Sequence, residues 1–435
     1  MRSYHHLLYA AAGQLARGAA VVAPARESKL WRALRARRGI RDRYACWGAE
    51  HRDPGRQLLW MHAPSVGEGL QARPILQIAR NRRPDLQLAY TYFSPSAARF
   101  AGGLPADFTD YLPFDTRGDS RAALNALRPS ALVYSKLDVW PLLSREAARR
   151  GVPLGLISAT LAAESSRRSG WAAGVLRDAY CLLDRVGAVD PADADRLVEL
   201  GVRPGVISVT GDTRYDQVWE RARSTDPRGE LLGPLASDRP TLVAGSTWPA
   251  DEAVLLPAWS RLRKRIPDAR LVIAPHEPVQ HHLDPIVDWA ATSHLHLARL
   301  DHTDAADADV VLVDRMGVLG ELYSLADVAF VGGAFHAAGL HSVLEPAAFA
   351  APVLFGPMYL ASRDAVLLIR SGGGRSISTD AELQDTLQEM LLSPTVLALA
   401  GTAARATVRS GLGAAERSWE IVVDLVGRTS EPEDR

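Results

Sequence analysis

Cysteine is scarce in this sequence of 435 residues, and several well-known motifs are missing. Cys46 and Cys181 are its only cysteines, which excludes a disulfide framework and a thiolate zinc site and is typical of a reducing compartment. The patterns G-x-G-x-x-G, G-x-x-x-x-G-K-[ST] and G-x-S-x-G do not occur, so the standard dinucleotide, P-loop and serine-hydrolase sites are excluded. Histidines and carboxylates with regular metal-ligand spacing are also absent, and we expect no metal site.

The sequence also lacks an uninterrupted apolar run of about 20 residues, the length that a bilayer-spanning helix needs. Its best candidate, residues 7–23, is broken by Gln14 and Arg17. Residues 1–43 contain ten Arg and Lys against Glu27 and Asp42, and because the total charge is zero, the remainder carries minus eight. We expect residues 1–45 to form an amphipathic helix and a basic segment on an anionic membrane surface. A solvated helix and a cleaved signal peptide, which the following arginines oppose, are the alternatives.

Length and strand pattern predict two domains. A chain of 435 residues is too long for one ordinary core. Short apolar strands alternate with helical segments from residue 57, and the alternation recurs after residue 205, beginning with VISVTG. This pattern predicts parallel sheets with crossover helices. We expect α/β domains at residues 46–205 and 206–428 that face a cleft at the carboxyl ends of their strands, followed by a disordered tail at 429–435.

The first strand of the amino-terminal domain runs into HAPSVGEG, residues 62–69. This turn is expected to place Glu68 at the cleft, with Gly67 permitting close approach of the backbone. A carboxylate there can act as the general base for an incoming hydroxyl. A glutamate that only stabilises the amino end of a helix fits the spacing equally well.

In the carboxy-terminal domain, a strand ends in Gly332 and Gly333, and a helix begins within GLHSVLEPAAF, residues 339–349. A glycine-rich loop before a helix is a phosphate-binding arrangement. His341 and Glu345 are four residues apart and are expected on one helical face, where Glu345 can accept both hydroxyls of a ribose or only cap the helix. Further residues at three other strand ends are predicted to complete a nucleotide site: Ser246, Thr247, His276, Met316 and Gly317.

Seven ordered motifs between about residue 57 and residue 365 resemble those of the 3-deoxy-D-manno-octulosonic acid (Kdo) transferases. HAPSVGE is similar to H-A-x-S-V-G-E, SKLDVWP (135–141) to an acidic-x-Trp segment, and GDTRYD (211–216) to G-[ND]-x-[KR]-[FY]-D. AGSTW (244–248) and APHEP (274–278) are similar to A-G-S-T-x and to a variant of the P-R-H motif. DRMGVLGELY (314–323) and the segment from FVGGAF to LFGP resemble the family's nucleotide-binding region.

The resemblance implies a GT-B fold, with two Rossmann-like domains, and an inverting glycosyltransferase of lipopolysaccharide synthesis. Such an enzyme moves Kdo from CMP-Kdo to the glucosamine disaccharide of a lipid A precursor, at the cytoplasmic face of the bacterial inner membrane. Glu68 is the implied base, Asp138 orients the acceptor or stabilises the oxocarbenium-like centre, and Ser65 and Gly67 contact the acceptor. Because CMP is a good leaving group, no metal or other cofactor is expected. No nucleic acid partner is expected either.

Four positions depart from the family pattern. Ser342 replaces an Asn, Asp138 replaces a Glu, the Arg of P-R-H is missing, and the N-A-R motif reads Ser158-Ala159-Thr160. Arg214, the predicted donor contact, and Arg315 or Arg363 are the candidates to bind the donor carboxylate instead. A GT-B enzyme with another nucleotide sugar or acceptor, and an inactive membrane-associated binding homologue, are the alternative functions.

Overall fold

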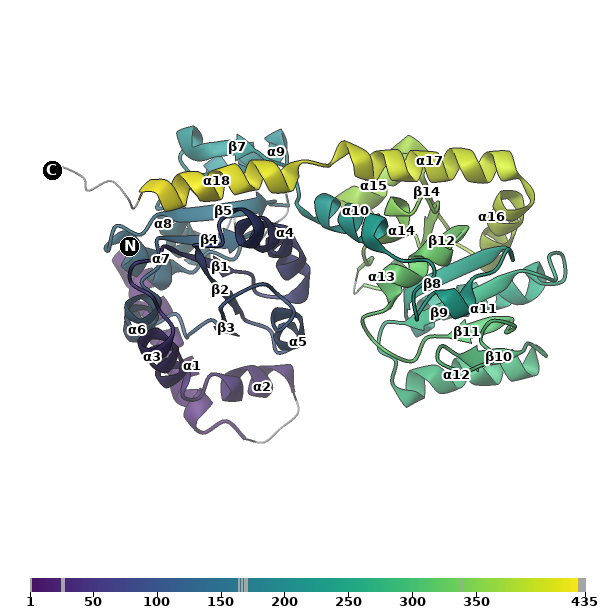
Figure 1. Cartoon of the computed structure of the whole chain (residues 1–435), viewed down its shortest axis with the longest axis horizontal. Coiled ribbons are helices and arrows are strands. Elements are labelled where there is room, and N and C mark those ends of the chain that lie inside the picture. Colours follow the sequence, from purple (N-terminus) through teal and green to yellow (C-terminus); the bar gives the residue numbers. More distant parts are fainter. Residues whose placement is uncertain are drawn as a thin grey trace. The chain divides into compact units, whose positions relative to one another are not determined.

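The computed structural model describes residues 2–24, 28–162, 165, 167, 171–337 and 339–428. The chain divides into two compact units. The first contains the described residues up to Gln217 and those from Leu412 onward, and the second contains Val218–Gly411. Each unit has a parallel sheet of seven strands with helices on its faces (Figure 1). The two predicted Rossmann-like domains are therefore confirmed.

The sheet of the first unit has the strand order β3-β2-β1-β4-β5-β6-β7. Its strands β1, β2, β4 and β5 are buried along their whole length, as is typical of parallel strands covered on both faces. The order reverses at β1, so the switch point, where ligands of such sheets bind, lies between β1 and β4. The strands are β1 (Leu58–His62), β2 (Gln87–Tyr92), β3 (Phe108–Tyr111), β4 (Ala131–Ser135), β5 (Leu154–Ala159), β6 (Arg185–Ala188) and β7 (Ile207–Val209).

Two helical layers cover this sheet, because successive strand side chains point to opposite faces. Leu58 and Trp60 pack with helices α3, α6, α7, α8 and α9, whereas Leu59 and Met61 pack with α4, α5 and α18. The helices of the unit are α1 (Arg2–Val21), α2 (Lys29–Ala36), α3 (Ile40–Glu50), α4 (Val66–Arg82), α5 (Ala97–Ala101), α6 (Arg117–Leu127), α7 (Pro141–Ala148), α8 (Trp171–Tyr180), α9 (Pro191–Leu200), α10 (Arg214–Ser224, which continues into the second unit) and α18 (Ala414–Arg428).

The sheet of the second unit has the order β10-β11-β9-β8-β12-β13-β14 and its switch point at β8. Its strands are β8 (Thr241–Thr247), β9 (Arg270–Pro275), β10 (Leu297–Arg299), β11 (Val310–Leu312), β12 (Val328–Val331), β13 (Val353–Phe355) and β14 (Gly374–Ser376). Its helices are α11 (Pro249–Leu262), α12 (Gln280–Thr292), α13 (Leu319–Leu322), α14 (Leu344–Ala348), α15 (Arg363–Ser371), α16 (Asp380–Leu392) and α17 (Pro394–Ser410).

The predicted domain limits need two corrections. The strand from VISVTG is β7, which pairs with β6 of the first sheet (Val186 with Ile207), so the units divide after Gln217 and not near residue 205. The carboxy-terminal helix α18 also belongs to the first unit, where it lies along α4 and β5 (Figure 1). Its buried Trp419, Val422 and Leu425 belong to the core on the α4 face of the sheet. The predicted tail at 429–435 lies outside the described residues.

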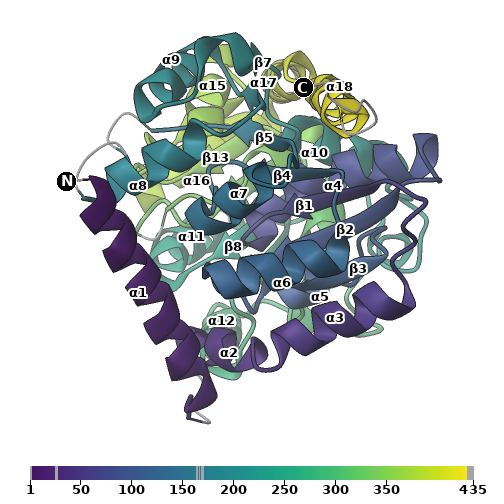
Figure 2. The same cartoon turned by 90° about the vertical axis from the view of Figure 1, so that its left-hand side faces the viewer.

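The amino-terminal segment forms a helix, as predicted, and it packs on the first unit. Figure 2 shows α1 beside α8 at one end and α2 at the other. The Tyr9 hydroxyl donates to Asp115 Oδ2 (2.8 Å), and a Cβ on Gly13 would lie 2.9 Å from the Asp115 carbonyl oxygen. No single helix of the described ranges is long and apolar enough to cross a membrane, although the bent pair Asp380–Leu392 and Pro394–Arg428 passes by length and composition.

Candidate active site

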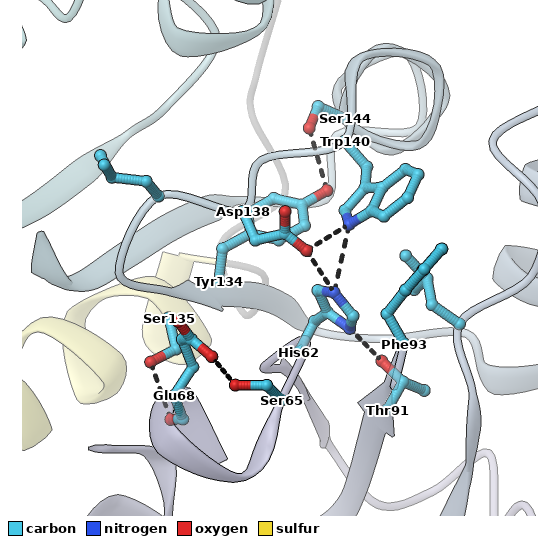
Figure 3. Close-up of polar contacts among 12 residues, drawn as sticks. His62, Ser65, Glu68, Thr91, Phe93, Tyr134, Ser135, Asp138, Trp140 and Ser144 are labelled. Carbon is cyan, nitrogen blue, oxygen red and sulfur yellow. Dashed lines mark hydrogen bonds and ion pairs between the residues drawn. The ribbon is translucent and has the colours of Figure 1, made fainter. Parts of the chain in front are cut away.

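Glu68 lies at the switch point of the first sheet. Strand β1 ends at His62, and the following turn leads to Ser65, which immediately precedes α4. Glu68 is the third residue of that helix, and both of its carboxylate oxygens are bound: the Ser65 hydroxyl donates a short hydrogen bond to Oε2, and Lys136 Nζ lies 3.2 Å from Oε1. Figure 3 shows Ser65 and Glu68 at the start of α4. The turn therefore follows β1 as predicted, and it places Glu68 in the first turn of α4.

The surroundings of Glu68 keep its carboxylate ionised. Burial is the largest effect and would raise the pKa of Glu68, but the Ser65 hydroxyl and the Lys136 ammonium outweigh it and lower the pKa below its ordinary value. The first turn of a helix also favours a negative charge. Both predictions for Glu68, a proton acceptor and a helix-end charge, fit this position.

The second acidic candidate, Asp138, lies in the loop that follows the neighbouring strand β4. Its Oδ2 is 2.9 Å from Trp140 Nε1 and 3.1 Å from His62 Nε2 (Figure 3). Burial, again the largest effect, would raise the pKa of Asp138, but the hydrogen bonds with His62 and Trp140 lower it overall. Sequence reasoning assigned no role to His62, and the only signal was its place at the end of a strand in the same motif as Glu68.

The loop that carries Asp138 is tied to the same site. The Ser135 hydroxyl donates to the Glu68 carbonyl oxygen (3.1 Å), and Lys136 has a positive φ of 64°. The Leu137 carbonyl oxygen accepts from Tyr180 Oη and Arg167 Nη1, both at 2.7 Å. One short loop therefore supports both acidic side chains, because it contributes Lys136 to Glu68 and presents Asp138.

The two predicted acceptor contacts differ: Ser65 already forms a side-chain hydrogen bond within the protein, whereas Gly67 has free space beside it. The Ser65 hydroxyl binds Glu68, whereas Gly67 is exposed and a Cβ there would come no closer than 3.8 Å to another residue. The internal packing therefore does not require glycine at position 67.

Arg214, a predicted donor contact of the second domain, is found in the first unit. It forms an ion pair with the buried Asp212 (2.8 Å), which also accepts from Gln71 Nε2 at 3.1 Å. Asp216 accepts from the backbone N–H groups of Gly413 and Ala415, each at 2.8 Å. The GDTRYD motif thus joins α4, α10 and α18 of the first unit.

In the second unit, four predicted residues meet at the carboxyl edge of β8 and β12. A Cβ on Gly332 would collide with the Ser246 carbonyl oxygen and lie 2.7 Å from the Thr247 Cα, so only glycine fits there. Gly333 has a φ of 98°, and its N–H donates to Asp251 Oδ2 (2.9 Å). The predicted convergence of Ser246, Thr247, Gly332 and Gly333 is confirmed.

His276 and His341 meet these residues through Trp248. The rings of Trp248 and His276 stack with centroids 4.7 Å apart, and those of His276 and His341 stack at 4.4 Å. Trp248 Nε1 donates to His341 Nε2 at 3.2 Å. Burial, with His276 and His336 nearby, lowers the pKa of His341 to about 4. Sequence reasoning missed Trp248, because it occupies the variable position of its motif.

Glu345 has a partner that the sequence did not indicate. Arg221 Nη1, from α10, lies 3.4 Å from Glu345 Oε1, and a side chain at Gly320 would collide with that guanidinium. Burial raises the pKa of Glu345, although Arg221 opposes the shift. His341 and Glu345 do not share a helical face, because α14 begins only at Leu344.

The remaining candidates lie at the surface of the second unit. Met316 is 61% exposed, Gly317 has a φ of 95°, and Ser342 is exposed. Arg315 pairs with Asp301 (2.7 Å), and Arg363 is exposed at the start of α15. Within the described ranges, no group of three or more His, Cys, Asp or Glu side chains has the geometry to hold a metal ion.

Comparison of the sequence with known proteins identifies the family. Residues 34–217 match a family model described as 3-deoxy-D-manno-octulosonic-acid transferase. The chain is 29% identical to the 3-deoxy-D-manno-octulosonic acid transferase of Bordetella pertussis, over 88% of this chain and 91% of the relative. It is 31% identical to that of Chlamydophila psittaci, over 72% of this chain and 73% of the relative.

Solved structures share the fold at low sequence identity. UDP-GlcNAc 2-epimerase from Neisseria meningitidis has a TM-score of 0.61 at 14% identity, covering 86% of this chain and 100% of the other. A glycosyltransferase from Rickettsia africae has a TM-score of 0.56 at 13% identity, covering 85% and 99%. The fold is therefore of the predicted GT-B class. Together with the sequence relatives, it shows that the chain is a glycosyltransferase and belongs to the 3-deoxy-D-manno-octulosonic acid transferase family.

Proposed function

We propose that this enzyme transfers Kdo from CMP-Kdo to a glucosamine hydroxyl of a lipid A precursor. Family membership supports the sugar and the reaction type. The observation that carries the proposal is Glu68, a carboxylate that Ser65 and Lys136 keep ionised at the switch point of the first sheet. An ionised carboxylate in that position can accept the proton of an incoming hydroxyl.

The reaction is a displacement at the anomeric carbon of Kdo. The acceptor oxygen forms a bond to that carbon on one face, and the bond to the CMP phosphate breaks on the other, so the configuration inverts. The electron pair of the broken bond leaves with the phosphate, and the hydroxyl proton passes to Glu68. Asp138 would orient the acceptor or stabilise positive charge at the anomeric carbon. In this proposal, CMP leaves without the help of a metal ion.

The residues around β8 and β12 would bind the nucleotide. Glycines at positions 332 and 333 let the turn after β12 pack closely against Ser246, Thr247 and Gly339. His276 and His341 would supply ring N–H groups that can take up the charge that develops on CMP. Glu345 would accept the ribose hydroxyls. The contacts among Ser246, Thr247, Gly332 and His341 support one common site.

The acceptor is a lipid, so the proposal also places the enzyme at the cytoplasmic face of a bacterial inner membrane. Leu8, Leu15, Val21, Val22 and Leu30 of the amino-terminal segment are exposed in the first unit, with exposures between 46% and 77%. Aliphatic side chains of this kind favour contact with a membrane interface.

The test is the variant Glu68→Gln, which keeps the size of the side chain but cannot accept a proton. We expect Kdo transfer, measured by mass spectrometry of the lipid product, to fall by about 100-fold or more, while CMP binding stays unchanged. Glu420→Gln, on the exposed side of α18, is the matched control. Activity of Glu68→Gln above about a tenth of wild type would remove Glu68 from the mechanism. Transfer from UDP-sugars in preference to CMP-Kdo would favour the alternative donor.

A further inference from the structure

A buried chain of hydrogen bonds lies behind Asp138. Trp60 Nε1 donates to Thr91 Oγ1 at 2.9 Å, and Thr91 Oγ1 lies 3.0 Å from His62 Nδ1. His62 Nε2 continues the chain to Asp138 Oδ2 at 3.1 Å. Trp60, His62 and Thr91 have no exposed surface. Buried polar groups cost free energy unless they are hydrogen-bonded, so each proton in this chain must have a definite place.

The chemistry of the donors fixes the direction of the chain. An indole N–H can only donate, so the Thr91 oxygen accepts from Trp60. The Thr91 hydroxyl hydrogen then has one acceptor among the described hydrogen bonds, His62 Nδ1. Because Nδ1 accepts, the proton of a neutral His62 ring lies on Nε2 and points at Asp138.

Trp140 Nε1 lies 3.1 Å from His62 Nε2 and 2.9 Å from Asp138 Oδ2. Because Nε2 carries the proton in this tautomer, the indole N–H goes to the carboxylate, and Asp138 Oδ2 receives two N–H donors, one from His62 and one from Trp140. Two charge-assisted bonds to one oxygen favour the ionised carboxylate. The pKa of Asp138 is lowered, in spite of its burial, in agreement with this arrangement. Oδ1 has no hydrogen-bond partner in the described part of the chain, and Figure 3 shows it turned away from His62.

We infer that His62 is a positioning residue that fixes Asp138 as an anion with one oxygen presented to the reacting sugar, and that Thr91 sets the tautomer of His62. The inference rests on the proposed function for the role of Asp138. It adds that this carboxylate stabilises positive charge and does not donate a proton. In catalytic triads, a buried carboxylate orients an imidazole through a hydrogen bond. Here the relation is reversed, because the imidazole of His62, itself held by Thr91, orients the carboxylate of Asp138.

Two amide variants of His62 separate this role from simple packing. In His62→Gln the amide nitrogen can reach the place of Nε2 and donate to Asp138, whereas in His62→Asn the shorter amide reaches only the place of Nδ1. We expect Gln to retain most of the wild-type kcat. The Asn variant should lose about 10-fold or more in kcat, with KM little changed. This is the loss of activity typically seen when a hydrogen-bond partner that orients a metal-binding histidine is mutated. Equal kcat values for the two amides at equal melting temperatures would overturn the inference.

A spectroscopic measurement on the wild-type protein does not depend on activity. In the protein labelled with ¹⁵N-histidine, we expect the His62 signal, identified by its loss in His62→Gln, to show the Nε2–H tautomer. In Thr91→Val, which has nearly the same shape but no hydroxyl, the Nδ1–H form should become populated. A wild-type Nδ1–H tautomer would refute the inference. If the protein transfers no Kdo at all, the proposed function fails, but the tautomer still decides the inference.

Discussion

Glu68 must meet two opposing demands, because a low pKa keeps it ionised but weakens it as a base. Lys136, which is 45% exposed, is the cation that lowers its pKa. We expect Lys136→Gln to raise the pKa of Glu68. Because the ionised form is the active one, activity is lost as the pH falls through this pKa, so the acid limb of kcat/KM should move to higher pH. Rate profiles between about pH 4 and pH 8 would measure the shift.

The control for this experiment is Lys264→Gln, an exposed lysine of the second unit. It should leave the profile in place. An unchanged acid limb in Lys136→Gln would mean that Glu68 is not the group whose ionisation limits the reaction.

Glu345 is the residue at which binding and structural roles can be separated most directly. If it accepts the ribose hydroxyls, Glu345→Gln converts charge-assisted hydrogen bonds to neutral ones and weakens CMP binding by about 1–2 kcal/mol. Arg221 opposes the rise in the pKa of Glu345, so Arg221→Gln should favour the neutral carboxyl and weaken CMP binding in the same direction. Calorimetric titration with CMP, beside melting curves of the unliganded proteins, measures both effects. Unchanged affinity with a lowered melting temperature in Glu345→Gln would assign the carboxylate to the pair with Arg221.

At the scale of elements, α18 depends on a distant residue for its first turn. The first N–H groups of a helix have no partner within the helix, and Asp216 accepts two of them, from Gly413 and Ala415. Asp216→Ala should destabilise the first unit by about 1–3 kcal/mol, because these half-buried donors lose their acceptor. Hydrogen exchange of the first turn of α18 should become faster. Asp385→Ala, at an exposed position of α16, is the control; equal melting temperatures for the two variants would contradict the capping role.

The sequence predicted the strands themselves well, but not the sheet to which each belongs. VISVTG has the apolar pattern of a strand, and nothing within it tells that it pairs with β6 and not with β8. For the same reason, the sequence does not show that α18 packs on the first unit. Glu68 could be predicted because it lies in the turn and helix start that follow β1, whereas Asp138 was predicted only through the resemblance of its motif to the family's. Their partners His62 and Lys136 could be paired with them only in three dimensions.

For the whole molecule, the structure changes the expected basis of membrane contact. Several arginines of the basic segment are bound within the first unit: Arg37 is buried and donates to the Leu112 carbonyl oxygen, and Arg43 pairs with Asp110. Arg38 donates to the Ala20 and Ala23 carbonyl oxygens. Arg37 is therefore withdrawn from the surface, whereas Arg38 and Arg43 are held against the unit but remain exposed.

The exposed apolar side chains are better placed for that contact. Leu8, Leu15 and Val22 are seven residues apart in turn, a spacing that keeps side chains on one side of a helix.

Deleting α1 would not test the contact cleanly, since it would also remove the Tyr9 bond to Asp115. We therefore expect the triple variant Leu8→Gln, Leu15→Gln, Val22→Gln to lower binding to anionic vesicles by about 10-fold or more while the protein stays folded, since each aliphatic side chain contributes about 1.5–3 kcal/mol when fully buried. High salt should release the wild-type protein only in part, because apolar burial is not screened. The matched control is Leu360→Gln, Leu392→Gln, Leu399→Gln, at exposed positions of the second unit. If the two triple variants co-sediment equally with the vesicles, or if salt releases the wild type completely, the arginines and not the apolar side chains make the membrane contact.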